Sequence, residues 1–403
     1  MEKLDPFDSN LTEVPYGEIA EMRSRCPVAH LDSGFYFASR HDDVAAALRD
    51  GGPRVKVFSH EGKMRALDVV VPDDEQLTGE IEGPRHTRLR QLLMTALHQR
   101  LVAASEPFVR ELSRSLLDDI IKRGRADLVA DYAVPIPSQV LAHIIGLPRE
   151  DFVLFRAWSE EVVSGDYATQ NKSERGEGLK GAHPEFCAYI DDLAADRLAN
   201  PRDDLISRMV HAEVDGSRFN ITQIRSSIAH LIMAGNETTT NLIGNALYEL
   251  LTAPTLLTRV RADRSLIAAL VEESLRRDPP VLIQPRTTVT HVALRDVAIP
   301  CGARVVFSIA GANRDGSVFV APDEFRVDRA NAKDHMSFGA GPHFCPGAPL
   351  ARLEARVAIE EFLDRVEHAP IDDDYEHHKI KVFWANGPDS LPVTVTRAPR
   401  PER

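Results

Sequence analysis

A single cysteine, Cys345, stands in a glycine-rich stretch that leads directly into a helical pattern, and this arrangement constrains the chain more than any other feature. The stretch Phe338–Gly347 reads FGAGPHFCPG, and the amphipathic run APLARLEAR follows it. At a helix N-terminus the macrodipole and nearby backbone N–H groups favour the thiolate form of a cysteine. A thiolate can serve as a nucleophile, as a structural metal ligand or as the axial ligand of a haem iron.

The other three cysteines help to choose between these uses. Cys26, Cys187 and Cys301 lie far from Cys345 in the sequence and form no C-x-x-C pair. A zinc site calls for further cysteines or histidines at close spacing, and a nucleophile calls for a base beside it. A haem needs only one ligand atom from the protein, so the pattern favours a haem-thiolate site.

The spacing F-G-x-G-x-H-x-C-x-G resembles, at every fixed position, the cysteine-ligand loop of the cytochrome P450 family. The matching positions are Phe338, Gly339, Gly341, His343, Cys345 and Gly347. The resemblance implies a soluble, bacterial-type cytochrome P450. Its fold is mainly α with small β-sheets (α+β), and residues 1–403 form one large domain. It also implies that Cys345 is the ligand of a haem b iron, and that Phe338, Gly339 and His343 contact the cofactor.

Charge and cysteine usage exclude several classes of partner. The chain carries 48 basic and 61 acidic residues, a formal net charge of −13, without a basic run. Nucleic acid and anionic membranes are therefore not expected partners. The first residues contain neither the apolar core of a signal peptide nor a membrane anchor. We expect a cytoplasmic protein, because four unpatterned cysteines suit a reducing compartment. We also expect a monomer.

An apolar stripe from Ile224 to Leu251 predicts one helix of about thirty residues, roughly 45 Å long. Its middle, AGNETTT at residues 234–240, consists of poor helix formers. A run of poor helix formers inside a predicted helix breaks the local propensity rules, and such exceptions tend to occur at functional sites. Gly235 admits a flat group close to the backbone, and an acid beside a hydroxyl, Glu237-Thr238, can relay protons. A helix with a polar, solvated face is the alternative.

The same run resembles the A-G-x-[DE]-T signature of the oxygen-binding helix in the cytochrome P450 family. The resemblance implies that Ala234 and Gly235 lie against the haem. It further implies that Thr238 acts on the dioxygen and that Glu237, where many members have aspartate, routes protons to it.

Basic side chains at two other places resemble the groups that hold the haem carboxylates in this family. His86 and Arg90, in H-T-R-L-R, share a helix face, which in an arbitrary protein would be a solvated pair. Arg286 follows the extended stretch Val281–Pro285. By resemblance, His86, Arg90, Arg286 and His343 bind the two propionates.

The remaining assignments also follow from the resemblance. Glu273 and Arg276 match the E-x-x-R pair, whose third member is Arg329, in a structural network behind the cysteine loop. The expected substrate walls are His230, Met233, Val281, Leu282, Ile283 and Trp384. Local patterns, and not the resemblance, predict a hairpin over residues 28–38 that turns at residues 32–34, an irregular loop over residues 58–77 and a helix over residues 99–121. Alternating residues at 379–382 and 391–395 predict a C-terminal hairpin with Trp384 at its tip. Residues 165–181 are either a moving lid or an ordinary surface loop.

The predicted function is a haem-thiolate monooxygenase that hydroxylates a hydrophobic small molecule with O2. Two electrons come from NAD(P)H through a separate reductase and ferredoxin, because the chain has no flavin or iron–sulfur motif. Three alternatives stay open. They are a peroxide-using peroxygenase, a haem-thiolate isomerase or dehydratase, and a non-enzymatic haem sensor.

Overall fold

The computed structural model describes residues 8, 11–49, 58–59, 75, 78–79, 81–163 and 178–397. Two compact units can be distinguished. The first unit comprises Met1–Asp50, Glu106–Pro137 and Glu237–Arg403, and the second comprises Gly51–Ser105 and Ser138–Asn236. The predicted long helix exists as α12 (Ile221–Thr252), with 32 residues, and the boundary between the units falls inside it.

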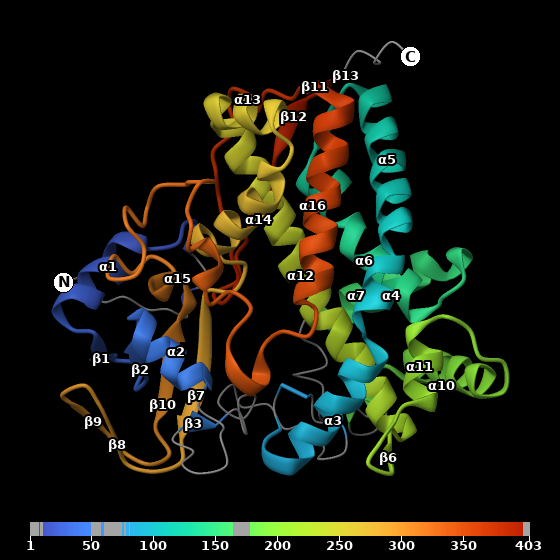
Figure 1. Cartoon of the computed structure of the whole chain (residues 1–403), viewed down its shortest axis with the longest axis horizontal. Helices are drawn as coiled ribbons and strands as arrows, with labels where there is room; N and C mark the ends of the chain where they lie inside the picture. The colour runs from blue at the N-terminus through green and yellow to red at the C-terminus, as the bar shows by residue number, and fades with distance from the viewer. Residues whose placement is uncertain are drawn as a thin grey trace. The chain divides into compact units, whose positions relative to one another are not determined.

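The N-terminal part of the first unit is a small sheet with helices beside it (Figure 1). Helix α1 (Tyr16–Arg25) precedes the hairpin of β1 (Val28–His30) and β2 (Tyr36–Ala38), and α2 (His41–Arg49) follows. The predicted hairpin is confirmed, and Gly34 turns it with a φ of 81°. Such a positive φ strains residues that carry a Cβ atom, which explains the glycine.

Later segments complete this sheet. Strand β10 (Arg304–Ser308) pairs parallel with β2 and antiparallel with β7 (Ile283–Thr288). A separate hairpin, β8 (Val292–Leu294) and β9 (Val297–Ile299), lies between them in the sequence. Because β10 is apolar and buried, it forms the centre of the sheet, and α1 packs on the cluster that it shares with β2.

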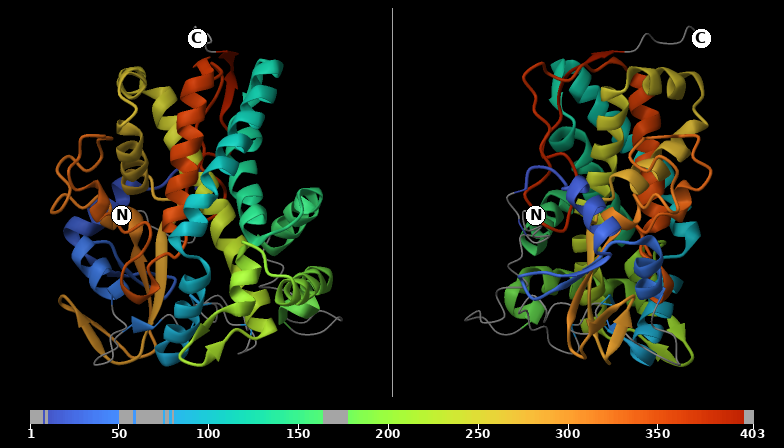
Figure 2. Two further views of the ribbon diagram at one scale, coloured as in Figure 1. Left: turned by 45° about the vertical axis from the view of Figure 1, so that its right-hand side comes forward. Right: turned by 90° about the vertical axis from the view of Figure 1, so that its left-hand side faces the viewer.

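The helical part of the first unit is built around α16 (Ala348–Arg365), which contacts α5 (Glu106–Arg123) and α14 (Leu266–Arg277) (Figures 1 and 2). The buried Tyr132 hydroxyl donates to the Ala358 carbonyl at 2.7 Å. Further helices of the first unit include the π-helix Val129–Ala133, α13 (Pro254–Ala262) and α15 (Ile309–Ala312), and α15 contacts α1 and α2. The helices outnumber the short strands, so the expected fold class, mainly α with small sheets, is confirmed.

The predicted C-terminal hairpin is wrong. Strand β12 (Pro392–Thr394) pairs with β4 (Arg125–Asp127), and β13 (Thr396–Arg397) pairs with β11 (Val366–His368). Residues 379–382 instead approach residue 388 through one isolated bridge. The alternating pattern was that of strands, but their partners lie far away in the sequence, where periodicity carries no pairing information.

The second unit is helical. It contains α3 (Gly83–Ala96), α4 (Gln99–Ala104), α7 (Phe152–Val163), α9 (Gly178–Ala182), α10 (Pro184–Ala199) and α11 (Leu205–His211). Short strands β3 (Phe58–Ser59), β5 (Glu213–Val214) and β6 (Ser217–Arg218) also belong to it, and α6 (Pro135–Ile145) begins in the first unit. Helix α11 contacts both α10 and α3.

Two expectations meet the limits of the described residues. Residues 165–177, which make up most of the expected lid over residues 165–181, lie outside them, as do most of residues 58–77, for which the sequence predicts an irregular loop. Across the parts of the chain that the structure describes, none of the helices combines the length and the apolar composition needed to cross a membrane.

Candidate functional site

The loop that carries Cys345 has a conformation that two of its glycines make possible. Gly339 and Gly341 have φ angles of 72° and 68°, in the left-handed region that other residues adopt at a cost. A Cβ atom on Gly341 would also lie 2.7 Å from Cα of Arg49 and 2.8 Å from the Leu48 carbonyl oxygen. The loop therefore rests directly on the end of α2, and only glycine fits at this position.

The thiol group of Cys345 is partly exposed just before the N-terminus of α16, whose N-cap is Gly347. The other cysteines have different surroundings. Cys187 is buried, and burial raises the pKa of its thiol to about 12, so it stays protonated. Cys26 and Cys301 are exposed, and none of the four forms a disulfide. Cys345 is therefore the cysteine placed to act as a thiolate ligand.

Behind the loop, Glu273 and Arg276 form a fully buried ion pair on α14. Nε and Nη2 of Arg276 donate to the two carboxylate oxygens of Glu273, each at 2.8 Å, and neither side chain is exposed. Nε of Arg329 donates to the same carboxylate at 3.0 and 3.2 Å. The structure thus brings together the three residues that the resemblance assigns to this network.

The network reaches the cysteine loop through a side chain that sequence reasoning missed, Asn313. Nη1 of Arg276 donates to the Asn313 carbonyl at 2.9 Å, and the Asn313 amide donates to the Ser337 hydroxyl at 2.9 Å. Ser337 directly precedes Phe338, whose carbonyl accepts a hydrogen bond from the Cys345 N–H at 2.9 Å. A continuous series of hydrogen bonds therefore fixes the loop relative to α14.

A second, parallel connection also escaped the sequence reasoning. Arg352 on α16 donates to both carboxylate oxygens of Glu272, at 2.6 and 3.0 Å, and its guanidinium lies 4.5 Å from the centre of the Phe338 ring. Burial alone would raise the pKa of Glu272, but hydrogen bonds from His335 and Arg352 lower it to about 2. Glu272 is therefore ionised and holds Arg352 over Phe338.

The polar interruption of α12 forms a partly exposed window in an otherwise buried helix. Ala234 is exposed and Gly235, Glu237 and Thr238 are half-buried, whereas residues 226–229 and 239–247 of the same helix are buried. A Cβ atom on Gly235 would meet nothing nearer than a Leu141 methyl at 4.0 Å. Burial raises the pKa of Glu237, so its carboxyl group retains a proton to higher pH than an exposed glutamate.

The groups expected to bind carboxylates are distributed over both units. His86, buried, and Arg90, half-buried, stand one turn apart on α3 of the second unit. In the first unit, Arg286 is buried in β7 and donates to the Pro285 carbonyl at 2.8 Å, and His343 is half-buried in a 3-10 turn.

The expected substrate walls are placed as follows. Val281 is half-buried, whereas Leu282 and Ile283 are buried in the apolar cluster that also contains Phe37, and Trp384 packs against this cluster. Met233 and His230 are half-buried on the part of α12 that belongs to the second unit.

These residues suit a haem. The cofactor needs a reachable thiolate on a rigid support, a small-residue helix surface, and cationic groups for its two carboxylates. Cys345 is partly exposed on a loop held by two glycines and a buried ion-pair network. The exposed Ala234 and the open side of Gly235 supply the helix surface of small residues.

Comparison with known proteins agrees with this chemistry. The family model described as cytochrome P450 matches residues 179–390. The erythromycin C-12 hydroxylase of Saccharopolyspora erythraea is 35% identical over 95% of this chain and 94% of its own. The structure of cytochrome P450 CYP109Q5 from Chondromyces apiculatus matches with a TM-score of 0.86 and 36% identity, over 95% of this chain and 96% of its own.

A second solved structure is CYP109E1 from Bacillus megaterium in complex with testosterone, with a TM-score of 0.84 and 28% identity. The match covers 95% of this chain and 99% of that protein. The similarity extends over nearly the whole length in each case. The chain belongs to the cytochrome P450 family.

Proposed function

We propose that this P450 monooxygenase hydroxylates a hydrophobic small molecule with O2 and two electrons delivered by a ferredoxin and its NAD(P)H-dependent reductase. The balanced reaction is RH + O2 + 2 e⁻ + 2 H⁺ → ROH + H2O. The observation that carries the proposal is the partly exposed Cys345, held before α16 by the buried network of Glu273 and Arg276.

As a member of the family the protein binds haem, which when bound supplies the activation of oxygen. Cys345 is the residue that would hold the haem iron through its thiolate, which would supply electron density to it. We assign His343, Phe338 and Gly339 to the proximal side of the cofactor, and Ala234 and Gly235 to the distal side. His86, Arg90 and Arg286 neutralise its carboxylates, as buried charges require partners.

Glu237 and Thr238 are the proposed catalytic residues. A hydroxylation that consumes two protons needs a group that still holds one near neutral pH. Burial raises the pKa of Glu237, which favours the protonated form of its carboxyl group, and Glu237 directly precedes Thr238 in the sequence of α12. In this proposal Glu237 supplies protons and the Thr238 hydroxyl passes them to the reacting oxygen.

The proposed substrate is an apolar molecule of about steroid size with one polar anchor. The expected walls contribute three aliphatic side chains, Val281, Leu282 and Ile283, and Met233, with His230 as a polar group. The similarity to CYP109E1, solved with testosterone and with corticosterone, supports this size class. A panel containing both steroids and a macrolide can be screened for the low-to-high-spin shift of the Soret band.

Electron delivery by a separate protein is proposed because the chain offers no second redox centre. An iron–sulfur cluster uses several cysteine ligands. The four cysteines here, at positions 26, 187, 301 and 345, are far apart in the sequence and form no cluster motif. Addition of ferredoxin, reductase and NADPH should start oxygen consumption, whereas product formed with peroxide alone at the same rate would favour the peroxygenase alternative.

The thiolate assignment has a direct spectroscopic test. The reduced, CO-bound protein should show the red-shifted Soret band of a haem-thiolate complex, and Cys345→Ala should lose it. Cys187→Ala, which removes a buried thiol of the second unit, is the matched control and should retain the band. A colourless protein, or a Cys345→Ala variant with an unchanged spectrum, would refute the assignment.

A further inference from the structure

Two stretches of the first unit that are distant in the sequence lie against each other. The first, residues 280–283, contains the expected substrate wall, and the second comprises residues 384–386. The N–H of Leu282 donates to the Trp384 carbonyl at 2.8 Å, and an antiparallel bridge adjoins this bond. We call them the 280 segment and the 384 segment.

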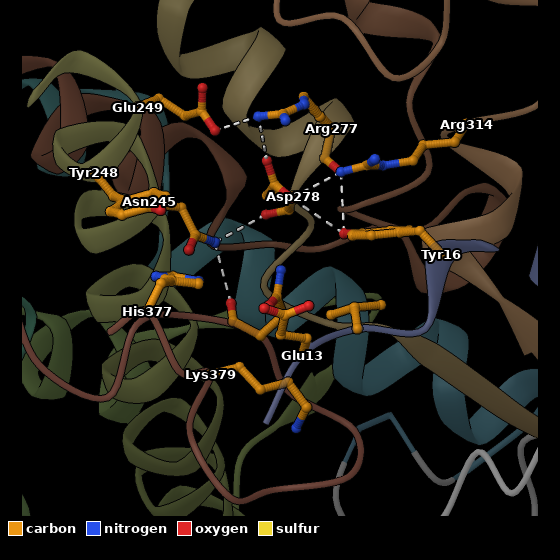
Figure 3. Close-up of a pocket in the computed structure, with 12 residues that line it drawn as sticks. Glu13, Tyr16, Asn245, Tyr248, Glu249, Arg277, Asp278, Arg314, His377 and Lys379 are labelled. Carbon is orange, nitrogen blue, oxygen red and sulfur yellow. Dashed lines mark hydrogen bonds and ion pairs between the residues drawn. The ribbon is translucent and has the colours of Figure 1, made fainter. Parts of the chain in front are cut away.

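One side chain of α12 ties both segments to the helix. The Asn245 side-chain amide donates to the Asp278 carbonyl at 3.0 Å and to the Asn386 carbonyl at 3.1 Å (Figure 3). Asp278 lies just before the 280 segment and Asn386 ends the 384 segment, where its own N–H donates to the Pro280 carbonyl at 3.0 Å. Asn245 is buried, with 6% of its surface exposed, so its amide is held in this position.

The contact between the 384 segment and α12 continues at close range. A Cβ atom on Gly387 would lie 2.3 Å from Oδ1 of Asn241, and one on Gly244 would lie 3.0 Å from a ring carbon of Pro388. Asn241, Gly244 and Asn245 stand at i, i+3 and i+4, and therefore occupy one face of the helix. Thr238 precedes Asn241 by three positions and shares this face.

We infer that Asn245 is a positioning residue that sets how far both wall segments stand from Thr238, and thereby the shape of the substrate cavity. This inference rests on the proposed function, because it needs the 280 segment to line the cavity. The two segments are bonded to each other, so one amide that holds the Asn386 carbonyl and the Asp278 carbonyl, two residues before the 280 segment, can place the pair as a unit.

A pocket of about 220 Å³ explains why the loss of Asn245 should shift the segments without unfolding them. It is lined by Asn245, Asp278 and Asn386, together with polar side chains such as Glu13 and His377 (Figure 3). A polar pocket of this size admits water. In Asn245→Ala, water can therefore bond to the two carbonyls, so neither is left buried without a partner, but the fixed distance to α12 is lost.

Two azoles of different size test the inference without knowledge of the substrate. Imidazole binds the iron and reaches little else, whereas clotrimazole also fills the cavity, and both shift the Soret band. We expect Asn245→Ala to weaken clotrimazole binding about tenfold, because the two segments are no longer held at a fixed distance from α12 and must be ordered when the azole binds. Imidazole affinity and haem content should change less than about twofold, since the iron site does not depend on the wall.

Two further variants separate positioning from general destabilisation. Asn245→Asp keeps the shape but removes the N–H donors, so it should weaken clotrimazole at least as much as Asn245→Ala. Asn313→Ala removes an equally buried asparagine that bonds to the Ser337 hydroxyl beside the cysteine loop. It should instead lower haem content and weaken both azoles alike.

The outcomes distinguish a failure of the positioning role of Asn245 from a failure of the proposed haem-thiolate function. If the unaltered protein binds clotrimazole and imidazole, and Asn245→Ala or Asn245→Asp retains the full clotrimazole affinity, the positioning role of Asn245 is wrong. An equal loss for both azoles in Asn245→Ala would also overturn it. If neither azole shifts the Soret band of the unaltered protein, the proposed haem-thiolate function itself fails.

Discussion

Arg276 donates two parallel hydrogen bonds of 2.8 Å to the carboxylate of Glu273, in a place where neither side chain has any exposed surface. In an ion pair buried this deeply, each charge depends on the other, because a buried charge that loses its partner destabilises the fold strongly. The pair stands on α14, but Arg276 also donates to the carbonyls of Asn313 and Pro322. Its main effect is therefore on the segments that lead to the cysteine loop.

Glu273→Ala should abolish haem incorporation rather than slow turnover. Removal of the carboxylate leaves Arg276 and Arg329 buried without it, at a cost of about 3–5 kcal/mol. Haem content per protein and urea unfolding measure the two effects. Glu21→Ala, which breaks the exposed pair with Arg25, is the control and should cost about 0.3–0.5 kcal/mol. A normally haem-loaded Glu273→Ala protein would contradict the prediction.

Thr238→Ala should uncouple oxygen consumption from product formation. If its hydroxyl transfers protons to the reacting oxygen, product formation should fall roughly 100-fold while oxygen is still consumed. Thr240→Ala is the matched control, because the Thr240 hydroxyl donates to the Ala133 carbonyl at 3.4 Å and serves the fold. An isomerase or dehydratase would show no such uncoupling, so an unchanged Thr238→Ala enzyme would point to that alternative.

Glu354→Gln should change how stability depends on pH. Glu354 is buried on α16, and burial raises its pKa from 4.5 to about 8. The folded protein keeps this proton between pH 4.5 and about 8 while the unfolded chain loses it, so stability falls over this window as pH rises. The slope is at most about 1.4 kcal/mol per pH unit, and the glutamine variant should lack it in urea titrations at each pH.

Glu272→Gln should show the opposite sign and serves as the comparison for Glu354→Gln. The pKa of Glu272 is lowered from 4.5 to about 2, so its carboxylate stabilises the fold above pH 4.5 and loses this contribution as pH falls through about 2. The glutamine variant should therefore be the less stable protein at neutral pH and approach the parent in strong acid. Two variants with the same pH trend would refute both assignments.

Gly341→Ala should prevent the cysteine loop from forming. The added methyl group would meet the backbone of Arg49 at 2.7 Å, in addition to the strain of a positive φ, so we expect a loss of several kcal/mol and little bound haem. Gly339→Ala carries the strain alone, because its Cβ would lie 3.8 Å from the nearest atom, and should cost about 1–2 kcal/mol. Similar haem loadings for the two variants would contradict this reading of the loop.

The elements predicted from local patterns are those whose determinants lie within a few residues of one another. The period of apolar residues predicted α12, and the turn residues around Gly34 predicted the β1–β2 hairpin. One expected helix over residues 99–121 proved to be two, α4 and α5, which meet at Ser105. Pro107 lies two residues beyond this break, where its missing N–H and fixed φ suit a helix start.

The residues of the site also fall into those with local determinants and those whose partners are distant in the sequence. The chemistry of Cys345, Glu237 and Thr238 could be proposed from residue types and spacing alone, because each motif is contained in one loop or one turn. The bond of Arg352 to Glu272, the link through Asn313, and the two carbonyls held by Asn245 could not be proposed in this way. Their partners lie tens of residues apart or more, and no local period relates them.

The sequence by itself determined which residues can do chemistry, because a thiolate loop, an acid–alcohol pair and left-handed glycines are local properties of the chain. Only the tertiary structure decided how those residues are supported. Strand β12 pairs with β4 rather than with its neighbour, and one asparagine of α12 holds two segments that are more than a hundred residues apart. Such contacts depend on the packing of whole elements, since many remote partners satisfy the same hydrogen-bonding group and only the folded chain selects one.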